Sequence, residues 1–390
     1  MFRGRDFLLR LGLIFSILLI LTGCWDKKEL DQLAMISMIG VDYDPEKDQI
    51  VMYYQVINPY SGASALEPGG PQSLVYTYRI EGRSFGEIRT LSFEWMSRYL
   101  FEAHFRMLIL SKSAAKHILR EVVNYIESLP RAKASASVLV AEDSLHDIMN
   151  HFILLERVPA QAIQNRLRYL IDFSLYVSRD IQLRDISERM LQDRVVVLPM
   201  IKVLPGKSDQ IEQRESNIDA SQDNVIITGG AVIKDFKMVG KMVDSDLISY
   251  NVLNGAKGRH TKLMTLNGKE VTLTYQPVRF KRTVTLRNNK PVITFHIDFM
   301  LTAERSIEYM PKTYQEAIKM EEAFDRRAKR KEQAFVEKYL AKGWDVVGVK
   351  DALKRYLPDY PQNDNILQEV EIQFVNHSNY MYPSHIQESY

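Results

Sequence analysis

The first 24 residues constrain this chain more than any other feature of its sequence. Arg3, Arg5 and Arg10 form a positive segment, and residues 11–21 (LGLIFSILLIL) form an apolar run of 11 residues. A helix rises ~1.5 Å per residue and needs roughly 20 apolar residues to cross a bilayer, so this run is too short for a permanent span. The pattern indicates a signal peptide at residues 1–23 that is removed before the protein folds.

The signal peptide ends in Leu21-Thr22-Gly23-Cys24, an aliphatic residue and two small residues before a cysteine. This pattern is typical of a lipoprotein signal, in which small side chains admit the peptidase and the thiol accepts a diacylglyceryl group. Two acyl chains hold a protein stably on a membrane, whereas a single chain binds marginally. The sequence therefore predicts lipidation at Cys24. The alternative is an ordinary signal peptide that happens to contain a cysteine.

The cysteine count and the charge balance support a secreted protein without nucleic-acid partners. Cys24 is the single cysteine in 390 residues, so no disulfide can form within the chain, and acylation protects a thiol that would otherwise be oxidised. Of 51 basic and 49 acidic side chains, three arginines and Asp6 lie in the signal peptide, which leaves 48 of each in the mature chain. This balance argues against a nucleic-acid partner, which requires a basic excess.

The mature chain, residues 24–390, is long enough for two or three domains. Its composition, 46% hydrophobic and 26% charged, is typical of a folded protein. Residues 206–223 are polar without an apolar period and predict a linker after an N-terminal α/β domain at 24–205. We expect a small middle domain at 224–269 and a C-terminal antiparallel α+β domain at 270–390.

The clearest unit in the N-terminal half is a strand, a helix and a second strand. Residues 105–110 (FRMLIL) and 137–141 (SVLVA) are apolar strands. Between them, Ser113 is predicted to cap a helix whose apolar residues recur three and four positions apart, and Pro130 to end it. A helical connection of roughly twenty residues implies a parallel pair with a right-handed crossover. We therefore expect a mixed sheet with helices in this half.

The sequence of the C-terminal half predicts short strands joined by tight turns. Strands are expected at residues 225–234, 237–242, 271–284, 291–301 and 366–375. The turns Asn254-Gly255, Asn267-Gly268 and Asn288-Asn289 predict antiparallel hairpins. This half should therefore contain an antiparallel sheet.

A long amphipathic helix is predicted to pack on that sheet. Thr313 and Glu316 form a capping box at its start, and Gly343 is placed to end it. A shorter helix is expected at residues 349–356. The predicted fold class is therefore α+β with three domains: a mixed sheet with helices in the N-terminal half, and an antiparallel sheet with a long helix in the C-terminal half.

The sequence patterns of zinc proteases and of nucleotide-binding sites are absent. The chain contains no H-E-x-x-H, G-x-x-x-x-G-K-[ST] or G-x-G-x-x-G. His146 and His151 are five residues apart, which places them about 140° apart on a helix, a poor arrangement for sharing a metal. The Glu321-Glu322 pair has basic neighbours, which favours a solvated, salt-bridged face over a glycosidase pair. We therefore predict no catalytic, metal or cofactor site and no enzymatic activity.

Residues 326–331 (RRAKRK) are the densest run of charge in the chain. One interpretation is contact with anionic lipid or an acidic partner. The other is a solvated helix face, partly balanced by Glu321, Glu322 and Glu332. The second is favoured, because an anchor at Cys24 already supplies membrane attachment.

Several segments together resemble the Ger(x)C family of spore-germination lipoproteins. They are Cys24-Trp25-Asp26 with Glu29-Leu30, Ile39-Gly40-Val41-Asp42, residues 105–110 and 137–140, Gly230-Ala231-Val232-Ile233-Lys234 with Val239-Gly240, and Gly343-Trp344-Asp345-Val346-Val347-Gly348 with Pro358. The resemblance covers nearly the whole mature chain. Ile233 stands where the family prefers Phe, Tyr360 where Trp is common, and residues 376–390 extend past the usual end.

This resemblance implies a three-domain α+β lipoprotein on the outer face of the inner membrane of the cell or spore. It implies the C subunit of a nutrient germinant receptor, acting with a membrane-embedded A subunit and a transporter-like B subunit, without catalytic residues or a cofactor. Direct binding of a small molecule is left open. Trp25 is interpreted either as an aromatic contact at the membrane–water boundary or as a hydrophobic plug of the first domain.

The alternative from another class is a lipid-anchored cell-wall hydrolase or a solute-binding protein. A solute-binding protein should show two similar α/β lobes. The two halves predicted for this chain differ, which disfavours that alternative.

Overall fold

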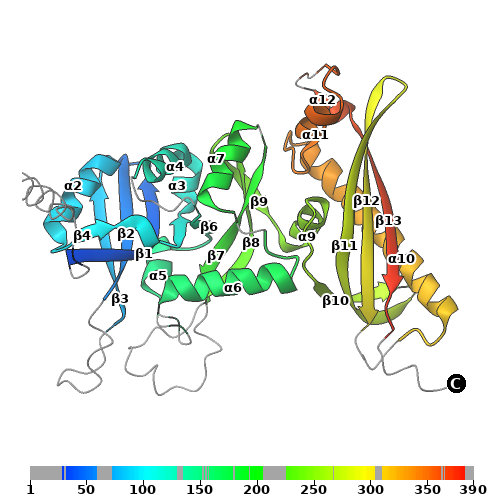
Figure 1. Cartoon of the computed structure of the whole chain (residues 1–390), viewed down its shortest axis with the longest axis horizontal. Helices are drawn as coiled ribbons and strands as arrows, with labels where there is room; N and C mark the ends of the chain where they lie inside the picture. The colour runs from blue at the N-terminus through cyan, green and yellow to red at the C-terminus, as the bar shows by residue number, and fades with distance from the viewer. Residues whose placement is uncertain are drawn as a thin grey trace, which may run out of the picture.

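The computed structural model of the chain describes residues 29, 32–58, 73–129, 135–151, 153, 156, 158–178, 181–192, 194–204, 225–266, 268–303, 310–361, 363 and 365–382. The predicted signal peptide, Cys24, Trp25 and the predicted linker at 206–223 lie outside these residues. Two sheets lie side by side along the long axis of the molecule, with helix α9 between them (Figure 1). In the part of the chain so described, we find no helix with the length and apolar character needed to span a membrane.

The first sheet contains nine of the described strands in the order β3-β2-β1-β5-β6-β7-β8-β9, with β4 beside the start of β1. Their bounds are β1 Leu33–Asp44, β2 Gln49–Ile57, β3 Val75–Gly82, β4 Tyr99–Phe101, β5 Met107–Leu110, β6 Ser137–Ala141, β7 Val196–Val203, β8 Val225–Lys234 and β9 Lys237–Met242. Strands β1, β5, β6 and β7 run parallel, and the outer pairs are antiparallel. The predicted parallel pair is confirmed, with Met107 opposite Ser137.

Helices cover both faces of the central parallel strands. They are α2 Phe85–Trp95, α3 Lys112–His117, α4 Leu119–Ser128, α5 Leu145–Asn150, α6 Pro159–Phe173 and α7 Leu183–Leu191, with a 3-10 turn, η2, at Glu102–His104. Leu108 and Leu110 of β5 join the core under α3 and α4, whereas Met107 and Ile109 join the core under α5 and α6. Because alternate residues face opposite layers, these strands are apolar throughout.

The predicted helix after β5 is present, but the predicted N-cap residue is wrong. Ser111, not Ser113, is the N-cap residue, and its Oγ accepts a hydrogen bond from the backbone N–H of Ala114 at 2.9 Å. Ser111 is the first residue after the strand and keeps an extended backbone, as a cap requires. The helix is also interrupted at Ile118, which divides it into α3 and α4.

Strands on both sides of the predicted linker pair with each other. Val196 of β7 lies opposite Ile233 of β8 in antiparallel register, so β8 and β9 extend the first sheet. Strands from the predicted N-terminal and middle domains therefore belong to one sheet. The boundaries between those domains stay a prediction.

The second sheet has the order β10-β11-β12-β13. Its elements are β10 His260–Leu266, β11 Lys269–Arg287, β12 Lys290–Ala303 and β13 Glu371–Tyr380, with helices α9 Asp244–Leu253, α10 Tyr314–Leu340, α11 Val349–Tyr356 and α12 Ile366–Glu369. Helix α10 lies along this sheet (Figure 1). Alternate residues of β12, Ile293, Phe295, Ile297 and Phe299, are buried in the core that it covers. The α+β fold class is confirmed.

One turn and both ends of the long helix in this half were predicted correctly. Asn288 and Asn289 both have positive φ, 51° and 60°, and form the two-residue turn between β11 and β12. Thr313 caps α10 by accepting from the N–H of Glu316 at 3.2 Å. Gly343, with φ 68°, follows the end of the helix.

Three expectations for this half require correction. Asn254-Gly255 does not form a hairpin, because it ends α9, a helix that the sequence analysis missed. The predicted last strand begins later, at Glu371, because Ile366–Glu369 is helical. Strand β13 pairs parallel with β12, since the chain returns through α10 before it rejoins the sheet.

Candidate functional site

Cys24, the single site residue predicted from sequence, lies outside the described residues. His146 lies against the ring of Tyr53, with ring centroids 6.0 Å apart, and Asn150 donates to the backbone oxygen of His146 at 2.8 Å. Over the described ranges, no three His, Cys, Asp or Glu side chains gather as metal ligands would. The features that remain are a junction between the two sheets and a cationic cavity.

The junction brings together two segments that the sequence analysis had noted separately. A Cβ atom on Gly240 of β9 would lie 2.5 Å from a ring carbon of Trp344, so the indole packs directly on the strand backbone. Lys234 Nζ donates to the carbonyl oxygen of Gly343 at 3.1 Å. The Trp344 ring also stacks on Tyr339 of α10 at 5.7 Å. The β8–β9 hairpin is therefore fixed to the turn that follows α10.

Gly240→Ala should weaken this contact. The added carbon forces the Trp344 ring away, and overpacking of this kind costs about 1–3 kcal/mol. Urea unfolding of the full chain, followed by tryptophan fluorescence, measures the loss. Gly86→Ala is the matched control, because its added carbon lies 3.9 Å from the nearest atom. Equal unfolding midpoints for wild type and Gly240→Ala would show that the indole does not rest on this glycine.

Asp345 organises the turn from inside. Its carboxylate accepts the backbone N–H groups of Val349 at 2.7 Å and Lys350 at 2.9 Å, and so caps α11. The side chain is buried, and this burial raises the pKa of Asp345 although the backbone N–H groups lower it. Gly348, at the helix start, has φ 70°, a conformation that glycine adopts without strain.

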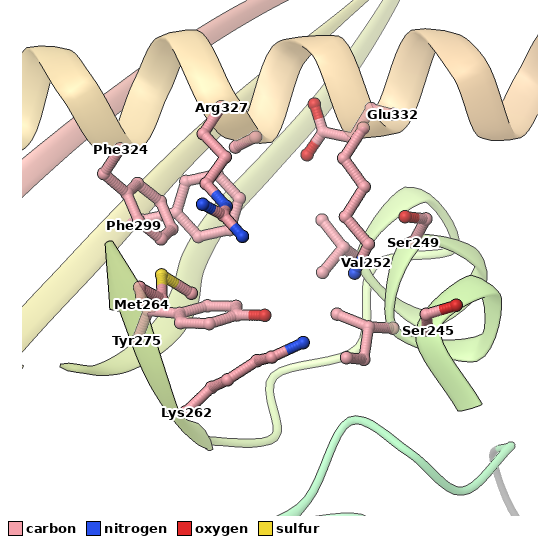
Figure 2. A pocket seen from close by; sticks show the side chains of 13 residues that line it. Ser245, Ser249, Val252, Lys262, Met264, Tyr275, Phe299, Phe324, Arg327 and Glu332 are labelled. Carbon is pink, nitrogen blue, oxygen red and sulfur yellow. The ribbon is translucent and has the colours of Figure 1, made fainter. Parts of the chain in front are cut away.

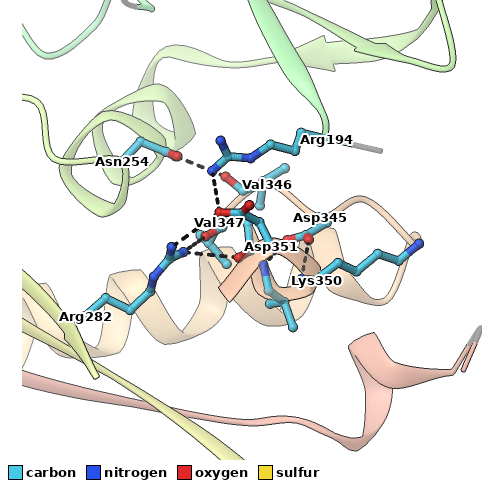
Figure 3. A network of polar contacts seen from close by, with 10 residues as sticks. Arg194, Asn254, Arg282, Asp345, Val346, Val347, Lys350 and Asp351 are labelled. Carbon is cyan, nitrogen blue, oxygen red and sulfur yellow. Dashed lines mark hydrogen bonds and ion pairs between the residues drawn. The ribbon is translucent and has the colours of Figure 1, made fainter. Parts of the chain in front are cut away.

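Three elements converge on the outside of the same turn (Figure 3). Arg282 of β11 donates to the carbonyl oxygens of Val347 at 2.8 Å and Gly348 at 3.1 Å. Arg194, next to β7, lies 3.7 Å from the Asp351 carboxylate of α11. Burial lowers the pKa of Arg282, although Asp351 nearby raises it. These contacts join the first sheet, the second sheet and α11, which is the arrangement of a structural joint.

The cavity lies between α9, strands β10 to β12 and α10, and has a volume of about 130 Å³. Its lining consists of Ser245, Ile248, Ser249, Val252, Lys262, Met264, Tyr275, Phe299, Phe324, Arg327, Ala328, Lys331 and Glu332. Arg327 and Lys331 belong to the basic run that we expected to form a solvated face. That interpretation is wrong for Lys331, which is partly buried, whereas Arg327 lines the cavity and is still exposed to solvent.

Two of the three glutamates expected to balance the basic run are hydrogen-bonded to other partners. Glu321 accepts the backbone N–H of Tyr380 at 2.6 Å, and Glu332 accepts from the side-chain amide of Asn376 at 2.9 Å. Both bonds tie α10 to β13, the edge strand of the second sheet. Glu322 does pair with the run, at 3.5 Å from Arg326. Of the pair Glu321-Glu322, which was expected to be solvated, Glu321 therefore has a structural role and Glu322 lies on the exposed face.

Exposed aromatic side chains gather where the first sheet begins. Phe93 and Trp95 of α2 are 50% and 63% exposed, and Tyr99 of β4 is 50% exposed. The rings of Phe93 and Tyr99 contact each other edge to face at 6.5 Å. Tyr99 lies opposite Leu33, the first residue of β1.

Comparison with known protein families matches both halves of the chain. The family model described as "Spore germination protein N-terminal domain" matches residues 26–203. The model described as "Spore germination B3/ GerAC like, C-terminal" matches residues 228–377.

Individual relatives agree with these matches. The Bacillus subtilis (strain 168) protein named spore germination protein KC is 23% identical over 383 residues, which cover 91% of this chain and 89% of the relative. Spore germination protein A3 of the same strain is 22% identical over 288 residues, 71% and 72% of the two chains. The crystal structure of the GerBC protein superposes with a TM-score of 0.56 at 14% identity, covering 88% of this chain and 97% of that one, which shows a shared fold.

Proposed function

This chain belongs to the Ger(x)C family of spore-germination proteins, and from that premise we propose that it is the lipid-anchored C subunit of a nutrient germinant receptor. The observation that carries the proposal is where the N-terminal match begins. It starts at residue 26, two residues after Cys24. In this proposal the diacylglyceryl group on Cys24 holds the protein on the outer face of the inner membrane. The folded part then docks to the integral membrane A and B subunits.

The exposed aromatic residues support this orientation. The nine residue-to-residue steps from Cys24 to Leu33 span at most about 30 Å when fully extended. Tyr99 lies beside Leu33 and contacts Phe93, and exposed aromatic rings suit the boundary between lipid and water. In the proposal this end of the first sheet therefore faces the membrane.

The proposed role is docking without catalysis. The joint around Asp345 uses its charged groups to hold backbone atoms, and both Glu321 and Glu332 bind β13. These polar groups have structural partners, which favours a receptor subunit over a lipid-anchored hydrolase. A solute-binding protein of two similar lobes is disfavoured by the two unlike sheets.

We expect deletion of the gene, or Cys24→Ala, to impair the response of spores to one class of nutrient germinant. The thiol is the single lipid acceptor, so the substituted protein should leave the membrane fraction and lose its partners. The assay is the fall in optical density of spores given amino acids or sugars. Spores given a trigger that bypasses nutrient receptors are the control and should germinate normally.

Two outcomes would contradict the proposal. Equal loss of germination with nutrients and with the bypass trigger would indicate a general role such as cortex hydrolysis. Metabolically incorporated lipid on the Cys24→Ala protein would show that the acceptor lies elsewhere.

A further inference from the structure

The cavity under α10 combines an apolar lining with three cationic side chains. The apolar members are Ile248, Val252, Met264, Phe299 and Phe324, all buried. The cationic members are Lys262 of β10 and Arg327 and Lys331 of α10. In Figure 2 the Lys262 ammonium, the Arg327 guanidinium and the Tyr275 hydroxyl point into the same space. Cations therefore meet apolar groups within one small volume.

The acidic groups nearest these cations are engaged with other partners. The Glu332 carboxylate accepts from Asn376, and the Asp246 carboxylate accepts from Lys338 at 2.6 Å and from the hydroxyl of Tyr339 at 2.8 Å. Among the described residues, neither lysine of the cavity forms an ion pair or a hydrogen bond. Among the described lining residues, Glu332 is the one carboxylate beside three cations, so the cavity keeps an excess of positive charge.

Lys331 is the deeper of the two lysines. Burial, followed by the charge of Lys262, lowers the pKa of Lys331 to about 8, because both effects disfavour a second cation there. Asp246 and Glu332 oppose this lowering, but neither carboxylate is hydrogen-bonded to the ammonium, and an anion beside it would supply that interaction. The nearby imidazole does not add charge, because burial lowers the pKa of His260 to about 4.

We propose that this cavity binds a small organic monoanion, with its carboxylate held by Lys262, Arg327 and Lys331 and a compact apolar group against the rings of Phe299 and Phe324. The volume sets the size, since a cavity of about 150 Å³ accommodates benzene, which corresponds to an apolar group of about four to six carbons. The one carboxylate among the described lining residues, Glu332, already accepts from Asn376, so an α-ammonium group would enter among three cations. The site therefore selects simple carboxylates over amino acids.

This inference goes beyond the proposed function. It depends neither on the lipid anchor nor on partner subunits, because every group involved belongs to this chain. It can fail while the receptor role stands, and the converse also holds.

The test compares three ligands of similar shape on the full chain purified in detergent. Isothermal titration calorimetry should show that isovalerate binds at least about tenfold more tightly than isovaleramide or L-valine. The amide lacks the charge, and valine adds an ammonium among three cations. Equal affinity for the acid and the amide would overturn the proposal, as would equal affinity for the acid and valine. Absence of isovalerate binding at about 10 mM would also overturn it.

Variants identify the residues. Lys331→Met should weaken isovalerate binding at least about tenfold, because it removes the buried charge. Lys329→Met is the matched control, since it removes an exposed charge from the same helix and should bind as wild type does. Lys262→Met, at an exposed position, tests the same charge cluster without disturbing the core. Unchanged affinity in both Lys331→Met and Lys262→Met would overturn the assignment.

Proton uptake gives an independent readout on the wild-type chain. At about pH 8 part of Lys331 is neutral, so binding of a carboxylate should protonate it. The heat of binding should then depend on the ionisation enthalpy of the buffer. If Lys331→Met binds isovalerate with the same proton uptake as wild type, the anion does not sit beside Lys331.

Discussion

Asp345→Ala is expected to lower the free energy of unfolding by about 3 kcal/mol, because it removes the acceptor of the buried N–H of Val349 and of the partly buried N–H of Lys350. Each unsatisfied buried donor costs about 1–3 kcal/mol, and the helix also loses its cap. The measurement is urea unfolding of the full chain followed by circular dichroism.

Asp351→Ala provides the comparison at the same joint. The Asp351 carboxylate pairs with Arg194 at 3.7 Å and with Arg282 at 4.0 Å, and it is partly exposed. Such pairs contribute about 0–1 kcal/mol, so the loss should be several times smaller than for Asp345→Ala. If the two variants lose equal stability, ion pairs hold the joint together, and the capping role assigned to Asp345 is wrong.

The turn around Asp345 also shows how far the sequence alone could lead. The segment from Gly343 to Gly348 stood out as a family motif, yet nothing in it identified Gly240 or Arg282 as its contacts. These residues come from different strands, and only the folded chain brings them together. The same holds for the cavity, where Lys262 and Lys331 lie on separate elements and each resembles an ordinary surface lysine.

Helix α9 was missed for a different physical reason. Residues 247–253 are all buried, so the segment is enclosed on every side and shows no amphipathic period. A continuous apolar run can be a buried strand or a buried helix, and periodicity cannot distinguish them. By contrast, α10 and β12 each have one covered face, which left the periods of 3.6 and 2 that sequence analysis detects.

Glu332→Gln is expected to stabilise the protein at about pH 8 and to leave its stability at about pH 5 nearly unchanged. Burial raises the pKa of Glu332 to about 7, and Asp325 adds to the rise, whereas Asn376 and Lys331 oppose it. The native state therefore holds this proton more tightly than the unfolded chain, whose pKa is near 4.5. Stability contributed by the neutral acid is present below about pH 4.5 and falls as the pH rises to about 7.

The size of this effect follows from the shift. A rise from 4.5 to about 7 corresponds to about 3 kcal/mol of stability lost at neutral and higher pH. Glutamine cannot ionise, so the variant avoids this loss, although it also gives up the attraction between Glu332 and Lys331. We therefore expect a net gain of about 2 kcal/mol at about pH 8.

The neutral side chain also fits the surroundings better than the carboxylate does. Asn376 Nδ2 donates to Glu332 at 2.9 Å, while Asn376 Oδ1 is buried without a hydrogen-bond donor among the described residues. A protonated carboxyl group or a glutamine amide can supply that donor, whereas a carboxylate cannot. Urea unfolding at the two pH values measures the difference. Glu337→Gln, on the exposed side of the same helix, should show no such pH dependence, and a gain for Glu332→Gln that is equal at both pH values would mean that Glu332 ionises normally.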